Sequence, residues 1–578
     1  MSVSDHPESS VTDADLPPAP ARSGRRVTCP RVFWPALGII VTFVVLALAA
    51  PGAMGDLFST LNGTVVGDLG WYYILIVSGF VAFALWIAVS PMGRIVLGRD
   101  EEAPEFGLRT WFAMLFAAGM GIGLVFWGVA EPLNHFAAPP PGTGDTPAEA
   151  ARVATDVTYL HWGLHAWGIY VIVGLAMAYA IHRKGRPVSI RWALEPLLGD
   201  RVKGWLGDTI DVIAVVGTVF GVATSLGFGV TQVGAGLEFL GAVGTAGTGL
   251  LVLLVIGITA MATVSVVTGL DKGIKFLSNV NMGLAGALML AVLILGPTVF
   301  LLGDFVSSVG SYVSNFFRLS FQTLSFEGSD GTAWLSGWTT FYWGWWMSWA
   351  PFVGVFIARI SRGRTVREFV AGVLLVPTLV TFLWFAVFGG SAIHREIFGE
   401  GGLIGPEGAV DTEGALFQLL DGFPLSGLLS VVAIVLVVIF FVTSSDSGSF
   451  VVDMLASGGN PEPPVWSRVL WATLEGAVAA ALLLAGGGGL SALQTAAILL
   501  ALPFSLVMIG MVFATTRALL REHGRLERAE RRLLADEVAG HIARTPGLRE
   551  EVSGNGSPRS RRAATPDPAE TREVPTGP

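Results

Sequence analysis

Residues 110–130 read TWFAMLFAAGMGIGLVFWGVA, a run without a charged side chain. A bilayer core about 30 Å thick is crossed by roughly 20 apolar residues in a helix, so this run predicts a membrane span. Gly119, Gly121 and Gly123 stand at alternate positions inside it, and each glycine weakens a helix by about 1 kcal/mol relative to alanine. Two interpretations follow: the helix is interrupted so that free carbonyls face a cavity, or small residues let helices pack closely.

Other stretches of the chain have the same apolar character. Of all residues 52% are apolar and only 14% are charged, against roughly a quarter charged in soluble proteins. We therefore predict an all-α polytopic membrane protein with twelve transmembrane helices. The predicted spans are 32–51, 71–92, 110–130, 160–182, 208–239, 248–268, 279–302, 338–358, 369–391, 424–446, 468–487 and 492–516.

Basic residues are distributed unevenly between the loops. If the N-terminus is cytoplasmic, the inner flanks of the twelve spans hold twenty Lys and Arg residues and the outer loops hold three. Lys and Arg accumulate on the cytoplasmic side of a membrane. We therefore expect a multi-pass protein of the cell membrane, embedded in the lipid bilayer, with both termini in the cytoplasm. The basic segment 359–367 fits the same rule.

The two ends of the chain are polar. Residues 1–31 lack the apolar core of a cleaved signal peptide and predict a disordered cytoplasmic tail. Residues 517–578 predict a second cytoplasmic tail, which is helical to residue 545, where Arg and Glu are interleaved, and then disordered. The charges of this tail nearly balance, which favours a solubilising role over a sensor of ionic strength or anionic lipid.

Two outer segments interrupt the pattern of spans. Glu131 and Pro132 are expected to end the third span, and a Pro/Gly loop is expected over 133–157. Apolar residues at helical spacing within 304–335 predict an amphipathic helix along the membrane surface, with an ordered loop as the alternative. These residues are Phe305, Val306, Val309, Tyr312, Val313, Phe316 and Phe317.

Several classes of chemistry find no support in the sequence. The single cysteine, Cys29, excludes an internal disulfide, and the histidines form no zinc-binding spacing. No basic patch with interleaved aromatic residues suggests nucleic acid binding. We expect no cofactor.

Tryptophan is dense in the eighth span, where residues 338–352 read WTTFYWGWWMSWAPF. Tryptophans in membrane proteins usually form interfacial belts, but four of them within seven residues of a helix point in several directions. The fourth span offers Trp162, Trp167 and Tyr170. Aromatic faces from two helices make a cage for a quaternary ammonium group, with each contact worth about 0.5–2 kcal/mol. Neither span contains an acidic residue, which favours a zwitterion or a cation held mainly by aromatic rings.

A run of hydroxyl side chains lies in the tenth span. Residues 443–449 read TSSDSGS, and hydroxyl and main-chain oxygens are ligands suited to a small cation. The alternative is that these hydroxyls bond back to their own helix.

Four stretches together closely resemble the betaine/choline/carnitine transporter family: 119–123, 342–354, 356–369 and 441–449. The resemblance covers about 32–516, which would then form the transporter domain. It implies a transporter and not an enzyme, with two inverted five-helix repeats formed by spans three to seven and eight to twelve. It also implies a homotrimer, with 305–317 at the subunit contact.

The resemblance assigns roles to particular residues. The implied substrate-binding residues are Gly119, Gly121, Gly123, Trp162, Trp167, Tyr170, Trp345, Trp346, Trp349 and, on the inner pathway, Phe356. One implied sodium site takes main-chain oxygens of Ala117 or Ala118, Met120 and Phe440 and the hydroxyls of Thr443 and Ser444. Family members with glycine at the position of Gly123 are typically sodium-coupled carriers of betaine-like solutes. Those with an acidic residue there tend toward choline or carnitine without sodium dependence.

The chain departs from the family pattern at a second sodium site. Sodium-coupled members use two threonines one helical turn apart in the fifth span. Thr218 is present here, but Val222 stands one turn later and supplies no side-chain oxygen. Thr224 would point about 200° away from Val222 on an ideal helix, so the residues put a two-sodium stoichiometry in doubt.

Three functional hypotheses follow from these features. The first is sodium symport of a betaine-type quaternary ammonium solute, such as glycine betaine, for osmoprotection. The second is a choline or carnitine transporter, either proton-coupled or exchanging substrates. The third is a channel or a membrane enzyme, which no ring of acids and no nucleophile–base pair supports.

Overall fold

A computed structural model describes residues 29–119, 121–268, 271–486 and 490–544 of the chain. Within these ranges it describes the backbone but not the side chains of 116–119, 271–275, 542 and 543. Of the tail predicted to be disordered over 1–31, residues 1–28 lie outside the described residues, whereas Pro30 and Arg31 already belong to α1. The predicted disordered stretch after residue 545 lies outside the described residues. The chain divides into two compact units, Met1–Leu519 and Leu520–Pro578.

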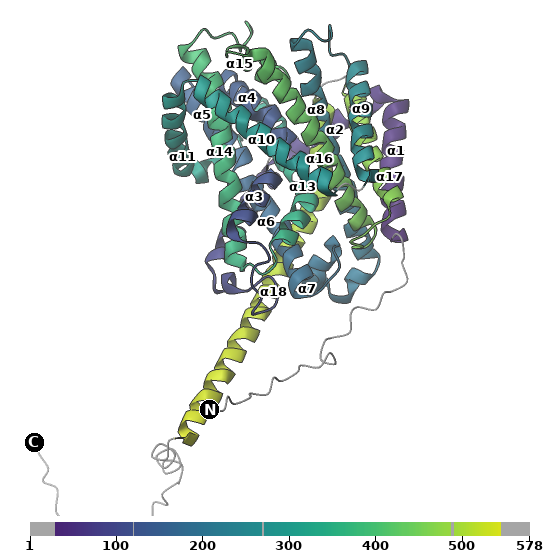
Figure 1. Cartoon of the computed structure of the whole chain (residues 1–578), viewed down its shortest axis with the longest axis vertical. Helices are drawn as coiled ribbons and strands as arrows, with labels where there is room; N and C mark the ends of the chain where they lie inside the picture. The colour runs from purple at the N-terminus through teal and green to yellow at the C-terminus, as the bar shows by residue number, and fades with distance from the viewer. Residues whose placement is uncertain (1–28, 120, 269–270, 487–489, 545–578) are drawn as a thin grey trace, which may run out of the picture. The chain divides into compact units, whose positions relative to one another are not determined.

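The regular elements of the described residues are helices, and their only β pairing is two isolated bridges. In the first half of the chain these are α1 Pro30–Ala49, α2 Pro51–Val89, α3 Leu108–Gly119, α4 Ile122–Ala137, α5 Pro147–Trp162, α6 Leu164–Ala178, α7 Glu195–Leu198, α8 Trp205–Phe239 and α9 Thr248–Thr268. The second half contributes α10 Asp271–Leu295, α11 Thr298–Ser320, α12 Gly328–Gly337, α13 Thr339–Ile360, α14 Val366–Phe398, α15 Ala415–Asp421, α16 Ser426–Ala456, α17 Val465–Ala485 and α18 Ser491–Arg544. The helices up to α17 form one bundle (Figure 1).

Ten helical stretches of the described residues are long and apolar enough to cross a membrane, and each overlaps one of the twelve predicted spans. The predicted all-α polytopic membrane protein is thereby confirmed. The two remaining predicted spans are the third, which is divided between α3 and α4, and the eighth, which is the tryptophan-rich α13. The count of twelve and the inverted repeats stay predictions.

Two predicted boundaries were wrong at the C-terminal end of the third span. Helix α4 does not end at Glu131-Pro132 but continues to Ala137 with Pro132 inside it. The loop expected over 133–157 is confined to 138–146, because Thr146 caps α5 by accepting a hydrogen bond from the Glu149 amide at 3.3 Å. Proline is tolerated inside a membrane helix when neighbouring groups satisfy the freed backbone.

Other predicted segments are longer in the structure than the sequence indicated. Helix α2 begins at Pro51, twenty residues before the predicted second span, and α16 continues ten residues beyond the predicted tenth span. The last predicted span and the predicted tail helix are one continuous element, α18.

The predicted amphipathic helix is confirmed as a helix. Helix α11 lies against α5 and α14 (Figure 1). Tyr312 is buried there, whereas Val306, Val313 and Phe317 are exposed. Its position at the membrane surface and its role in a subunit contact stay predictions.

The basic segment after α13 fastens neighbouring segments together. The Arg364 guanidinium donates to the Phe106 carbonyl at 2.6 Å, and Arg362 forms an ion pair with Glu102 at 2.6 Å. The backbone N–H of Arg99 and the Arg362 guanidinium hold the pKa of Glu102 below its usual value. These arginines have structural partners beyond the general preference for basic residues on one side of the membrane.

A close crossing of α6 and α13 brings the aromatic residues of both helices together. Helix α13 packs extensively against α6. A side-chain carbon added to Gly354 would lie 2.6 Å from Cγ1 of Val173 and 3.1 Å from the amide nitrogen of Gly174. Because real Cβ contacts are never this short, glycine at 354 sets the distance between the two helices.

Gly354→Ala is expected to destabilise the protein, because the added methyl forces α6 and α13 apart at a typical cost of about 1–3 kcal/mol for overpacking. The matched control is Gly257→Ala in α9, where an added carbon meets no atom within 4 Å. Both changes raise helix propensity by about 1 kcal/mol, so only packing differs. Thermal unfolding in detergent measures the difference. Equal melting temperatures for the two variants would contradict the proposed close contact.

Candidate functional site

A narrow cavity of about 30 Å³ lies where α4, α6 and α13 meet, with contributions from α5, α8 and α14. Its walls are Gly121, Gly123, Leu124, Trp162, Ala166, Trp167, Tyr170, Ser225, Trp345, Trp346, Trp349 and Thr381. We call it the aromatic cavity. Eight of the ten substrate residues expected from the sequence line it. Phe356 lines the next cavity instead, and Gly119 belongs to the residues whose side chains the structure does not describe.

The rings of the aromatic cavity are fixed against one another. Trp345 and Trp346 stack with centroids 4.6 Å apart, and Trp162 meets Trp346 edge to face at 4.8 Å. The indole N–H of Trp346 donates to the His161 carbonyl at 2.9 Å, and that of Trp345 donates to the Ser225 hydroxyl at 3.2 Å. All three rings are at most 5% exposed, so they form an interior cage and not an interfacial belt.

Two donors of the aromatic cavity are unoccupied. The Tyr170 hydroxyl and the Trp349 indole N–H are both buried, and neither has a hydrogen-bond partner among the described residues. Buried polar groups in proteins are nearly always hydrogen-bonded. These two groups can therefore donate to an acceptor on a molecule inside the cavity.

An interrupted helix brings backbone to the rings. Helix α3 ends at Gly119, α4 begins at Ile122, and Gly121 between them is extended. A side-chain carbon on Gly123 would lie 2.7 Å from Cη2 of Trp345 and 3.0 Å from Cη2 of Trp162. The helix is therefore interrupted at the glycine run, and glycine at 123 permits close contact with two rings, while free carbonyls facing the cavity stay a prediction.

A second and larger cavity of about 160 Å³ adjoins the first, with Trp349 lining both. Its walls include Phe356 and three of the expected sodium residues, Phe440, Thr443 and Ser444. Of the remaining expected sodium residues, Met120 lies outside the described residues, and so do the side chains of Ala117 and Ala118.

The cavities continue from α13 toward charged side chains. A third cavity shares Phe352, Phe356 and Ser447 with the second and reaches Arg359 and Arg468. The aromatic cavity is thus linked, through shared wall residues, to a path along α13 and α16.

Three hydroxyls of the TSSDSGS run, those of Thr443, Ser445 and Ser449, have partners inside the protein. Thr443 donates to the Ile439 carbonyl at 2.9 Å, which is the bond back to the helix that the sequence left open. A hydroxyl oxygen that donates keeps two lone pairs, so this bond leaves Thr443 able to act as a ligand. Ser445 instead donates to Glu475 in α17 at 3.0 Å.

The residues considered for a second ion site lie elsewhere. The Thr218 hydroxyl is fully buried and donates to the Ala214 carbonyl at 2.7 Å, and Thr218 lines none of the three cavities. The Thr224 hydroxyl bonds back to Phe220 at 2.9 Å. A second sodium site that includes Thr218 stays a prediction.

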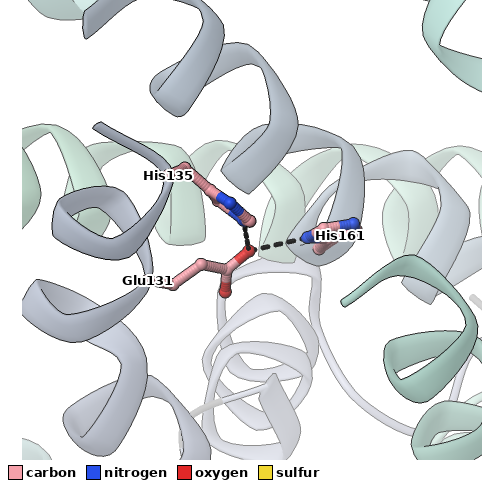
Figure 2. Close-up of side chains that lie close together, drawn as sticks. All are labelled: Glu131, His135 and His161. Atoms are coloured by element: carbon pink, nitrogen blue, oxygen red, sulfur yellow. Dashed lines mark hydrogen bonds and ion pairs between the residues drawn. The ribbon is translucent and has the colours of Figure 1, made fainter. Parts of the chain in front are cut away.

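Sequence reasoning missed a buried polar cluster next to the aromatic cavity. The Glu131 carboxylate faces His135 from its own helix and His161 from α5 (Figure 2). His161 Nδ1 lies 2.7 Å from Glu131 Oε1, and His135 Nε2 lies 3.4 Å from the same oxygen. All three side chains are fully buried. The spacing of Glu131 and His135 could have revealed the pair, but Pro132 was taken as the end of the span.

The cluster resembles a zinc ligand set in composition only. Its three ligand atoms lie within 4.8 Å of one another, and two histidines with one glutamate can bind zinc. Ligands around a tetrahedral zinc stand about 3.3 Å apart, because each bond measures about 2.0–2.1 Å. The 2.7 Å between His161 and Glu131 is instead a hydrogen-bond distance.

The chain is similar to transporters along most of its length. Residues 31–524 match the model of the BCCT, betaine/carnitine/choline family transporter. An uncharacterized transporter of Mycobacterium tuberculosis is 54% identical over 494 residues, 85% of this chain and 82% of that protein. The glycine betaine transporter OpuD of Bacillus subtilis is 46% identical over 501 residues, 86% of this chain and 96% of that protein. A glycine betaine/proline/choline transporter of Vibrio parahaemolyticus is 44% identical over 511 residues, 85% of this chain and 90% of that protein. This chain is therefore a multi-pass membrane transporter, not an enzyme, and it belongs to the betaine/carnitine/choline transporter family.

Proposed function

We propose that this chain imports a betaine-type quaternary ammonium solute by sodium symport and serves osmoprotection. The observation that carries the proposal is the aromatic cavity. Its rings Trp162, Trp345 and Trp346 have centroids 4.6 to 6.1 Å apart. A trimethylammonium group has no N–H to donate, so ring faces and dispersion must hold it. A cage of indole rings supplies both.

The walls of the aromatic cavity favour a zwitterion over a simple cation. Its lining residues include no Asp or Glu. The unpartnered Tyr170 hydroxyl and Trp349 indole N–H offer donors for the carboxylate of a betaine. Choline has a hydroxyl in that place and gains less from two donors. Gly123 and the relatives named glycine betaine transporters support the same choice.

Sodium coupling is supported by the second cavity. Phe440, Thr443 and Ser444 lie together along its wall, next to the Trp349 ring that borders the aromatic cavity. Main-chain and hydroxyl oxygens at this place suit a small cation. We propose one sodium site here and leave Thr218 out of it. We also propose that the transporter is a homotrimer of the cell membrane with both termini in the cytoplasm.

A choline or carnitine carrier is the second candidate. The observation that favours it is a relative whose printed name includes both glycine betaine and choline. The same aromatic cage binds any trimethylammonium group, so ion dependence and a solute panel must separate the two candidates.

Purified protein in proteoliposomes is expected to concentrate labelled glycine betaine only under an inward sodium gradient. Choline and carnitine are expected to compete weakly, because neither is a short zwitterion whose carboxylate can accept from the unpartnered Tyr170 hydroxyl and Trp349 indole N–H. Uptake of choline without sodium would instead establish the second candidate. Solute that equilibrates without accumulating would indicate a channel. Protein-free liposomes serve as the control.

Trp346→Leu is expected to raise the KM for glycine betaine about tenfold, because one cation–π contact is worth up to about 2 kcal/mol and 1.4 kcal/mol is a factor of ten. The matched control is Trp466→Leu in α17, whose ring is exposed and lines none of the three cavities. Initial uptake rates across a concentration series measure KM. An unchanged KM in Trp346→Leu would show that the solute binds elsewhere.

Thr443→Val is expected to raise the sodium concentration for half-maximal uptake several-fold, because valine keeps the shape and removes the oxygen. Thr473→Val is the control, since its hydroxyl donates to Val469 at 2.8 Å as Thr443 donates to Ile439 at 2.9 Å. Sodium titrations of betaine uptake compare the two variants. Equal shifts in both would mean that the hydroxyl of Thr443 acts only within its helix.

A further inference from the structure

One buried carboxylate holds two aromatic residues of the cage region. Glu131 Oε2 accepts hydrogen bonds from the Trp162 indole N–H at 2.6 Å and from the Tyr342 hydroxyl. Trp162 lines the aromatic cavity, and Tyr342 stacks on Trp346, with centroids 5.8 Å apart. Glu131 itself does not line the cavity. It therefore stands behind the cage and touches it through the rings.

The other oxygen of Glu131 is held by an imidazole. His161 Nδ1 lies 2.7 Å from Oε1, and His161 Nε2 lies 2.9 Å from the Thr339 hydroxyl. When the proton of a neutral His161 is on Nδ1, this N–H donates to Glu131, and the bare Nε2 accepts from the Thr339 hydroxyl. Both ring nitrogens are then hydrogen-bonded. Two donors on Oε2 and one on Oε1 are the arrangement that an ionised carboxylate attracts.

The titratable groups facing Glu131 do not supply a permanent positive charge. They are His135 from α4, His161 from α5 and Tyr342 from α13, and no Lys or Arg of the described residues forms an ion pair with Glu131. An ionised carboxylate in the membrane interior is costly without a counter-charge. A cation inside the aromatic cavity, which Trp162 lines, would provide one.

We propose that Glu131 is a positioning residue that places a negative charge behind the aromatic cage and thereby selects substrates with a quaternary ammonium group. Its hydrogen bonds to Trp162 and Tyr342 fix these rings, and a carboxylate bonded to an indole N–H pushes electron density toward the ring face. The ring face then attracts a cation more strongly. The wall of the aromatic cavity can thus lack acidic residues while a carboxylate outside it still acts on the substrate through the rings.

This inference rests on the proposed function, because it assumes that the cage holds the trimethylammonium group of a betaine. Two ligands separate charge from shape. Glycine betaine carries the trimethylammonium group, whereas 3,3-dimethylbutanoate replaces it with an uncharged tert-butyl group and keeps the carboxylate. Both fill the same space and carry the same carboxylate, so a difference between their responses reports the effect of Glu131 on the ammonium charge.

The variant to test is Glu131→Gln. Glutamine keeps an oxygen to accept from Trp162 and Tyr342, and its amide can donate to Nδ1 of the other His161 tautomer, so the bonds persist while the charge is lost. Titrations of tryptophan fluorescence with the full-length protein in sodium-containing buffer measure both ligands. We expect betaine binding to weaken roughly tenfold and 3,3-dimethylbutanoate binding to change by less than about twofold.

The control is Glu475→Gln. Glu475 is also fully buried and also accepts a side-chain hydrogen bond, from Ser445, but neither residue lines the aromatic cavity. It should leave the affinities for both ligands unchanged. Equal weakening of both ligands by Glu131→Gln would show that Glu131 acts by shape alone, and no weakening of betaine would show that it has no role. Either result would overturn the proposal.

Two further results keep the test decisive. If Glu131→Gln does not fold, the wild-type protein alone decides: similar affinities for glycine betaine and for 3,3-dimethylbutanoate would refute a charge behind the cage. A wild-type protein that binds neither ligand would contradict the proposed function itself. Failure of the inference and failure of the proposed function are therefore distinguished by the wild-type titration with betaine.

Discussion

A backbone carbonyl in the membrane interior must find a donor within the protein, and this requirement organises the site. The chain breaks a helix after α3 and again at Gly163, between α5 and α6. Carbonyls beside the second break accept from other helices: His161 from Trp346 at 2.9 Å and Trp162 from Thr381 at 3.2 Å. The hydrogen bond that satisfies the His161 carbonyl beside the break thus also holds the Trp346 ring of the cage in place.

Backbone carbonyls beside the first break also accept hydrogen bonds from other helices. The Leu124 carbonyl accepts from the Trp384 indole N–H at 2.8 Å, and the Val125 carbonyl accepts from the Gln232 amide at 3.2 Å. Side chains of α14 and α8 therefore support α4 just where its glycines leave it weak. The aromatic cavity is bounded by irregular backbone on one side and by stacked rings on the other.

Hydropathy predicted the fold well because lipid imposes one rule on every span, and ten of the twelve predicted spans overlap apolar helices. The two that fail the same criterion, 110–130 and 338–358, form the site. The first fails because its interruption leaves α3 with 12 residues and α4 with 16, each too short to count as a span. The second fails because its tryptophans lower the apolar character of α13. Boundaries failed where local rules misled, as at Pro132, which reads as a helix end but lies inside α4.

The site was partly predictable for a related reason. Rings such as Trp346 are distinctive residues in a recognisable pattern, and eight expected residues line one cavity. Glu131 was missed because its importance depends on partners from α5 and α13, distant in sequence, which no local spacing reveals. The expected ion ligands are only partly placed, since Met120 lies outside the described residues.

Trp349 belongs to two walls at once, because the aromatic cavity and its neighbour share this ring. Any two ligands that fill these cavities together meet at a single indole. Thermodynamic reciprocity then requires that each alter the affinity of the other by the same factor. The shared Trp349 ring can therefore couple the affinities of the two cavities directly, without the movement of a helix.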